Sequence, residues 1–215
     1  MKLSSKIFTI VIIPLIICSC ATVRLNNQGN IKSPIEMNTY RITIQDEKAW
    51  QDWAASKKPE NDILILEKLT VWPLTGEVQK ITRIAVIKDT VSPEGWGFTE
   101  KEHADIIRNN EEKIMIEKSS TGGMYQLQNV NKSDLLRNDK MLYVLTWRAP
   151  RGSDILASFT RSFFSECAMY LYFPKNFKDT HIFYRFMISD SYIPGTIFLI
   201  NLDQVLEVID GFEIK

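Results

Sequence analysis

The side chains that could carry out covalent chemistry are few in this 215-residue chain, which has three cysteines and two histidines. Cys167 could act as a nucleophile with His181 as its base and Asp179 to orient the imidazole, because a catalytic thiol needs a base and the base needs a partner. The sequence around this thiol, Ser-Glu-Cys-Ala, has no glycine that would form a sharp turn. A buried thiol that packs as a small apolar residue is the simpler interpretation, so a Cys/His hydrolase is the least favoured function.

Metal and nucleotide sites have weaker support. Glu102-His103 and the Asp179/His181 pair could each begin a metal site, but the H-E-x-x-H spacing is absent. The Gly-x-Gly and Gly-Gly pairs lack the spacing of phosphate-binding loops and are interpreted as turns. His103 falls on a polar helical segment, so we expect it to be solvated. The sequence therefore predicts a protein without a metal or cofactor that is not an enzyme.

The other two cysteines, Cys18 and Cys20, end an apolar run at the N-terminus. The first six residues are short and basic, Ile7–Ile17 is apolar except for one threonine, and Ser19 is small. A basic region, an apolar run of this length and a small-residue cleavage site are the three parts of a secretory signal peptide. A membrane-spanning helix would need about 20 apolar residues, and Pro14 interrupts this shorter run. Residues 1–19 are therefore predicted to be a signal peptide.

The end of that run, Ile17-Cys18-Ser19-Cys20, resembles the lipobox of bacterial lipoproteins. In that family a diacylglycerol is added to the thiol, the peptide is cut before the cysteine, and the new N-terminus is acylated. The resemblance implies lipid attachment at Cys20 and a membrane anchor formed by several acyl chains, which gives stable attachment. In organisms with two membranes, alanine after the cysteine implies the outer membrane, and Ala21 fits. A metal clip or a disulfide between the two cysteines is the alternative.

The charges of the chain are balanced, with 26 basic and 26 acidic residues. Loss of residues 1–19 removes Lys2 and Lys6, which leaves 24 basic against 26 acidic residues. Basic residues are interleaved with acidic ones, so the basic stripe of a nucleic-acid-binding protein is missing, and we expect no nucleic acid partner. The composition, 45% hydrophobic with 11% aromatic residues, is typical of a folded domain.

The polar, turn-rich residues 20–38 are interpreted as the lipidated N-terminus and a flexible tether, and residues 39–215 as one globular domain. Strands are predicted from alternation and β-branched runs, and helices from apolar spacing and from the Thr99-x-x-Glu102 capping box. The predicted strands are 40–44, 63–72, 77–88, 114–117, 124–130, 141–147, 168–173, 181–188 and 195–200, the predicted helices are 46–56, 100–110 and 201–209, and a polar loop is predicted at 131–139. Short connections favour antiparallel pairing, so we expect a single α+β domain with a large, mainly antiparallel, curved sheet and two to four helices.

Aromatic residues are concentrated between Tyr143 and Phe198, which hold 14 of the 23 in the chain. We expect most of them to fill the core, although they could also line an apolar groove. The favoured function is a non-catalytic, membrane-anchored envelope lipoprotein that acts as a binding or assembly partner of another envelope component. The alternative is a carrier of an apolar ligand or acyl chain in a cavity enclosed by a curled sheet.

Overall fold

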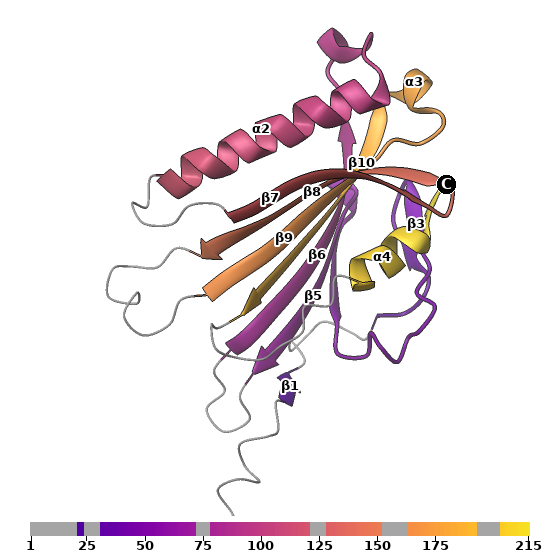
Figure 1. Ribbon diagram of the computed structural model, residues 1–215. Helices are drawn as coiled ribbons and strands as arrows, with labels where there is room; N and C mark the ends of the chain where they lie inside the picture. Colours follow the sequence, from indigo (N-terminus) through magenta and orange to yellow (C-terminus); the bar gives the residue numbers. More distant parts are fainter. Residues whose placement is uncertain (1–20, 24–30, 72–77, 121–127, 152–162, 193–202) are drawn as a thin grey trace, which may run out of the picture.

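The computed structural model describes residues 21–23, 31–71, 78–120, 128–151, 163–192 and 203–215 (Figure 1). The predicted signal peptide 1–19, the predicted lipid-attachment residue Cys20 and the predicted strand 195–200 lie outside these residues.

The main structural element is an eight-stranded antiparallel sheet. Its order is β1 (Ala21–Val23), β5 (Ile63–Val71), β6 (Val78–Thr90), β10 (Ile182–Tyr192), β9 (Phe163–Tyr172), β8 (Lys140–Arg151) and β7 (Gln128–Arg137), and β4 (Ala54–Lys58) also pairs with β5. A small second sheet has the order β11 (Phe212–Ile214), β3 (Tyr40–Ile42) and β2 (Ile35–Glu36). The helices are α2 (Glu100–Ser120), α3 (Phe177–Thr180) and α4 (Asp203–Asp210), with 3-10 turns η1 (Pro59–Asn61) and η2 (Pro93–Gly95). The predicted α+β class and mainly antiparallel sheet are confirmed.

The central strands are apolar on both faces because both faces are covered. On one face lies the α4-side core, which joins the sheet to α4 and to the small sheet; its largest members include Tyr40, Trp50, Leu142, Tyr184, Phe186 and Phe212. On the other face lies the α2-side core, beneath α2; its members include Ala104, Tyr143, Leu145, Met169, Phe173 and Phe183. Figure 1 shows α2 and α4 on opposite sides of the curved sheet. The strand predicted at 181–188 is therefore central, as its two apolar faces indicated.

Local hydrogen bonds explain one incorrect prediction. Residues 46–56 form a series of turns followed by β4, not a helix, although Trp50 and Trp53 are buried together with ring centroids 4.7 Å apart. The backbone bonds of these turns join residues three apart, such as the Trp50 N–H to the Glu47 carbonyl. From Ala54 onward the backbone pairs with β5 instead. The spacing of the two tryptophans therefore reflects burial and not a helical period.

Two further predictions, for the segments 114–117 and 131–139, are wrong because contacts between α2 and β7 decide the structure of both. The predicted strand 114–117 belongs to α2, which continues ten residues beyond the predicted end of the helix. The predicted polar loop 131–139 is mostly the strand β7, whose Lys132 ammonium donates hydrogen bonds to Asn109 and Glu112 of α2. Asn138 and Asp139 then make a two-residue hairpin turn with positive φ angles of 47° and 60°. Asn and Asp tolerate this backbone, which is typical of tight hairpins.

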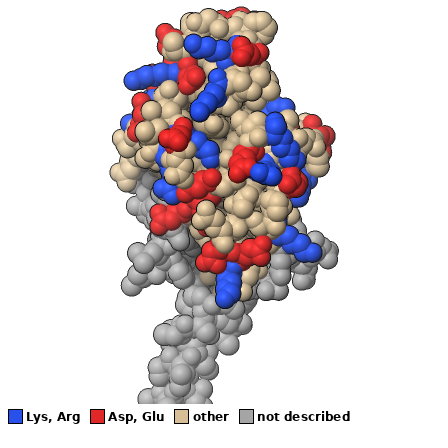
Figure 2. Space-filling view, turned by 90° about the vertical axis from the view of Figure 1, so that its right-hand side faces the viewer, with Lys and Arg blue, Asp and Glu red and all other residues tan. Residues whose placement is uncertain are grey.

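The folded core begins before the predicted domain start at Thr39. Ile31, Ile35 and Met37 are buried in the α4-side core, and Ala21–Val23 pair with β5. These apolar residues are few and lie among polar and turn-forming ones, which is why the segment was interpreted as a tether. On the face that Figure 2 shows, basic and acidic side chains are intermixed, as the interleaved sequence indicated.

Candidate binding groove beside helix α2

Cys167 and His181, the residues of the hydrolase hypothesis, lie at opposite ends of the sheet. Cys167 on β9 pairs with Ser189 on β10, whereas His181 directly precedes Ile182, the first residue of β10. Seven residues of antiparallel strand separate Ile182 from Ser189, which corresponds to about 24 Å. This separation removes Cys167 and His181 as a nucleophile–base pair.

Both histidines contact the segment that joins β6 to α2. His181 stacks flat on Trp96, with ring centroids 4.3 Å apart and an interplanar angle of 4°. His103 is buried among Phe98, Phe173 and Phe177, so the prediction that it is solvated is wrong. It occupies the inward face of an otherwise polar helix. Among the residues that the structure describes, no three His, Cys, Asp or Glu side chains form a group that could hold a metal ion.

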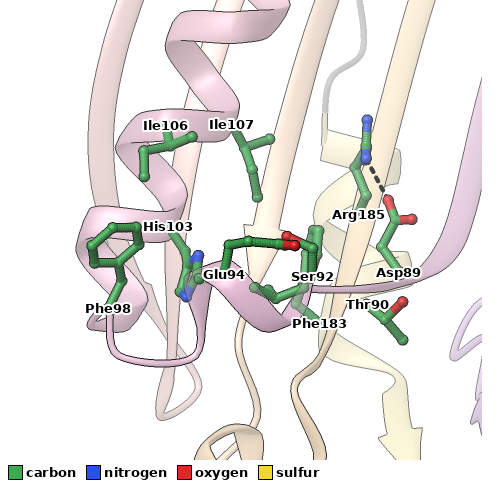
Figure 3. A pocket seen from close by; sticks show the side chains of 12 residues that line it. Asp89, Thr90, Ser92, Glu94, Phe98, His103, Ile106, Ile107, Phe183 and Arg185 are labelled. Carbon is green, nitrogen blue, oxygen red and sulfur yellow. Dashed lines mark hydrogen bonds and ion pairs between the residues drawn. The ribbon is translucent and has the colours of Figure 1, made fainter.

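A groove of about 390 Å³ lies between the first turns of α2 and the ends of β6 and β10 (Figure 3). This volume is within the range of about 300–1,000 Å³ that is typical of ligand sites. Asp89 and Thr90 come from β6, Val91, Ser92, Glu94, Gly95 and Phe98 from the connecting segment, His103, Ile106 and Ile107 from α2, and Phe183 and Arg185 from β10. Figure 3 shows Phe98 and Ile106 on the helix side of the groove and Arg185 and Asp89 on the strand side.

Local interactions fix the connecting segment, residues 91–99, in place. The Val91 N–H donates to the His181 carbonyl at 2.9 Å, and the Gly95 N–H donates to the Ser92 carbonyl at 2.9 Å. The predicted capping box starts α2, since the Thr99 N–H donates to the Glu102 carboxylate at 2.7 Å and the Glu102 N–H donates to the Thr99 hydroxyl at 3.3 Å. The Thr99 N–H and hydroxyl lower the pKa of the Glu102 carboxyl. The groove wall therefore has a defined conformation.

Carboxylates outnumber cations in the groove. The Arg185 guanidinium bonds to Asp89, and its other end lies 3.9 Å from the Glu111 carboxylate. Glu94 is a third carboxylate, and hydrogen bonds from Ser92 and from its own backbone lower its pKa, so it is charged at neutral pH. The Nε atom of Arg185 is buried and has no hydrogen-bond partner among the described residues. The lining residues thus hold two carboxylates, Asp89 and Glu94, and one guanidinium, which Asp89 and Glu111 share.

The rim of the groove exposes large apolar side chains to solvent. Phe98 and Ile106, which line the groove, are 48% and 43% exposed, and Trp96 in the same connecting segment is 55% exposed. Grouped apolar exposure of this kind beside a hollow marks an interaction site more often than isolated exposed residues do. Gly95-Trp96-Gly97 was interpreted from the sequence as a turn, and two aromatic residues so close together, Trp96 and Phe98, were the available signal of a site.

Further hollows lie at the same end of the sheet. One of about 450 Å³ is lined by residues that include Asn38, Asp62 and Lys88, and one of about 270 Å³ by residues that include Asn38, Asn176 and Tyr184. The sheet that the described residues form has two ends, at β1 and β7, and packed side chains cover both faces of its central strands. The groove beside α2 is a surface site.

Comparisons with known proteins add little to this picture. No family model matches the chain, and no curated protein matches it. Among solved structures, the chain is similar to the solution structure of cyanobacterial PsbP (CyanoP) from Synechocystis, with a TM-score of 0.43 and 12% identity over 93% of this chain and 94% of that one. A likeness this distant carries no argument about function.

Within the described part of the chain, no helix has both the length and the apolar character needed to cross a membrane.

Proposed function

We propose that this protein is a non-catalytic binding protein of the bacterial cell envelope, anchored by lipid on Cys20, that holds another envelope protein in the groove beside α2. The observation that carries the proposal is the exposed apolar rim of the groove, formed by Phe98 and Ile106, with the exposed Trp96 on the same connecting segment. In an organism with two membranes, Ala21 after the lipidated cysteine favours the outer membrane.

The topology supports a partner that lies outside the bilayer. Cys20 directly precedes β1, which pairs with the end of β5 at Val71, and Val71 in turn pairs with Val78 at the start of β6. The groove lies at the other end of β6, twelve residues further on at Thr90. At about 3.4 Å per residue this is about 40 Å of strand. Figure 1 shows β1 and the first turn of α2 at opposite ends of the molecule. A lipid on Cys20 would therefore leave the groove well away from the membrane surface.

The anchor is tested by replacing one cysteine at a time in the full chain. Cys20→Ser should lose both acyl labelling and retention in the membrane fraction, because the thiol that receives lipid is gone. Cys18→Ser is the matched control, since that residue leaves with the signal peptide, and it should keep both properties. Unchanged retention of Cys20→Ser would refute the anchor.

The binding role is tested with a photoreactive amino acid in living cells. Benzoylphenylalanine at Phe98 or Ile106 should give discrete protein adducts, because both side chains lie at the groove. The control position is Leu136, which is 67% exposed near the β7–β8 turn. Adducts at the groove positions and not at the control support the proposal. If no adduct depends on the groove positions, the proposed function is wrong.

A further inference from the structure

The charge distribution of the groove restricts what can occupy it. Asp89 neutralises Arg185, and Glu111 lies against the same guanidinium, with side chains that are 32%, 23% and 22% exposed, respectively. Glu94 also lines the groove, is exposed to solvent, and is not one of the carboxylates that contact Arg185. Any occupant therefore meets more carboxylates than cations.

The cations of neighbouring elements do not cancel this surplus. On α2, Lys101 points to Asp134 at a distance of 3.8 Å. Arg108 is buried and donates to Asp134 and to the carbonyl of Ser133, on β7. Lys88, although on β6 beside Asp89, has its ammonium 3.7 Å from Asp62, at a different hollow. These cations are engaged elsewhere, so none of them neutralises Glu94, and Asp89 and Glu111 share the single guanidinium of Arg185.

Three kinds of occupant can be compared on these terms. An anion, such as a fatty acid carboxylate, would be repelled by the like charges of the groove carboxylates. A purely apolar segment would cover Ile106 and Phe183 but would remove water from carboxylates without replacing it. A cation beside an apolar side chain satisfies both parts of the surface. The groove thus favours an occupant that is basic and apolar together.

A polypeptide meets both requirements, because an apolar side chain and a basic side chain can lie next to each other along one segment. The choice of a polypeptide follows the proposed function.

From these observations we infer that the groove beside α2 binds a protein segment in which a leucine, isoleucine or aromatic side chain lies next to lysine or arginine. The apolar side chain packs on Ile106, Ile107 and Phe183, and the cation meets Glu94 and the carboxylates around Arg185. This inference rests on the proposed function and specifies the chemistry of the partner.

The test uses three capped decapeptides as probes: alternating Leu and Lys, alternating Leu and Glu, and alternating Ser and Lys. Each is labelled with a fluorophore and titrated against the full chain in phosphatidylcholine nanodiscs, with empty nanodiscs as the blank. The Leu–Lys peptide should bind at least about tenfold more tightly than either control peptide, a difference of about 1.4 kcal/mol. Decanoate should not displace it.

Paired variants show whether the groove is responsible. Glu94→Lys should weaken Leu–Lys binding about tenfold and favour the Leu–Glu peptide, while Ile106→Ser should weaken Leu–Lys binding alone. Glu47→Lys, at an exposed position among the turns before β4, and Leu136→Ser are the matched controls and should change nothing. All four positions are exposed, so the fold is retained.

Each outcome is decisive. Equal or tighter binding of the Leu–Glu peptide, displacement by decanoate, or equal effects of Glu94→Lys and Glu47→Lys would overturn the inference. If groove-specific adducts form in cells while the peptides show no basic preference, the proposed function stands and this inference fails. If the peptide preference holds but cells give no groove-specific adducts, the binding role in the envelope fails and the chemistry of the groove stands.

Discussion

Replacement of Gly95 by alanine should deform the groove, because this glycine lies where no side chain fits. A Cβ atom at this position would lie 2.7 Å from Cε1 of His103 and 2.8 Å from Cγ1 of Val91. Carbon atoms in contact are about 3.5–4.0 Å apart, so both neighbours would have to move by about 1 Å. His103 is 5% exposed and packed by phenylalanine rings, so the segment 91–99 must move instead.

The size of the effect follows from two opposing contributions. Overpacking in a well-packed region costs about 1–3 kcal/mol. Replacement of glycine by alanine also restricts the unfolded chain, which returns about 0.4–1 kcal/mol. The free energy of unfolding should therefore fall by about 1–2 kcal/mol in Gly95→Ala. Gly97 is the matched control in the same segment, since a Cβ atom there meets nothing within 4 Å, and Gly97→Ala should be neutral or slightly stabilising.

Urea unfolding of the full chain in mild detergent, followed by tryptophan fluorescence, measures this difference. The adduct yield with benzoylphenylalanine at Phe98 measures the accompanying change in the groove and should fall in Gly95→Ala but not in Gly97→Ala. A second substitution, Val91→Ala, removes one of the two clashes and should restore part of the yield. If the two glycine variants are equally stable and give equal yields, the packing of His103 against Gly95 does not position the groove.

Three further predictions concern contacts that hold the fold. Lys140→Met should lower the free energy of unfolding by about 2 kcal/mol, because the Lys140 ammonium donates to the carbonyls of Ile209 at 2.6 Å and Phe212 at 2.9 Å at the end of α4. The control Lys113→Met, at an exposed position, should change the free energy of unfolding by less than about 0.5 kcal/mol. Asp62→Ala should lower the free energy of unfolding by about 3 kcal/mol in the same assay, because the buried carboxylate accepts hydrogen bonds from the Asn38 N–H and the Thr39 hydroxyl, both at 2.9 Å. Equal stability of the variant and wild type would refute this role. Glu102→Ala should destabilise α2 at neutral pH. Because the folded-state pKa of Glu102 lies below its ordinary value of 4.5, its contribution to stability is present above that value and is lost as the pH falls through the lowered pKa. A difference in unfolding free energy from wild type that does not shrink in acid would contradict the capping box.

Elements whose partners lie nearby in sequence were predicted well. The β5–β6 hairpin, the start of α2 at the capping box and the helix α4 each depend on side chains within a few residues of one another. The burial of His103 was missed because phenylalanines more than 60 residues further along the chain surround it. The strand β7 was missed because α2 satisfies its polar side chains.

The sequence by itself determined the local features of this protein: the capping box, the central strand with two apolar faces, and the lipobox resemblance that predicts lipid on Cys20. Each is written in neighbouring residues or in a simple period. Only the tertiary structure decided where the groove lies, because Asp89 and Arg185 are 96 residues apart in the chain. Apolar periodicity indicates which face of an element is buried, but not how far a covering helix extends across a sheet. Here the first turns of α2 meet the ends of β6 and β10 at a groove. The groove is negatively charged because this arrangement brings Asp89 and Glu94 together with a single cation, Arg185.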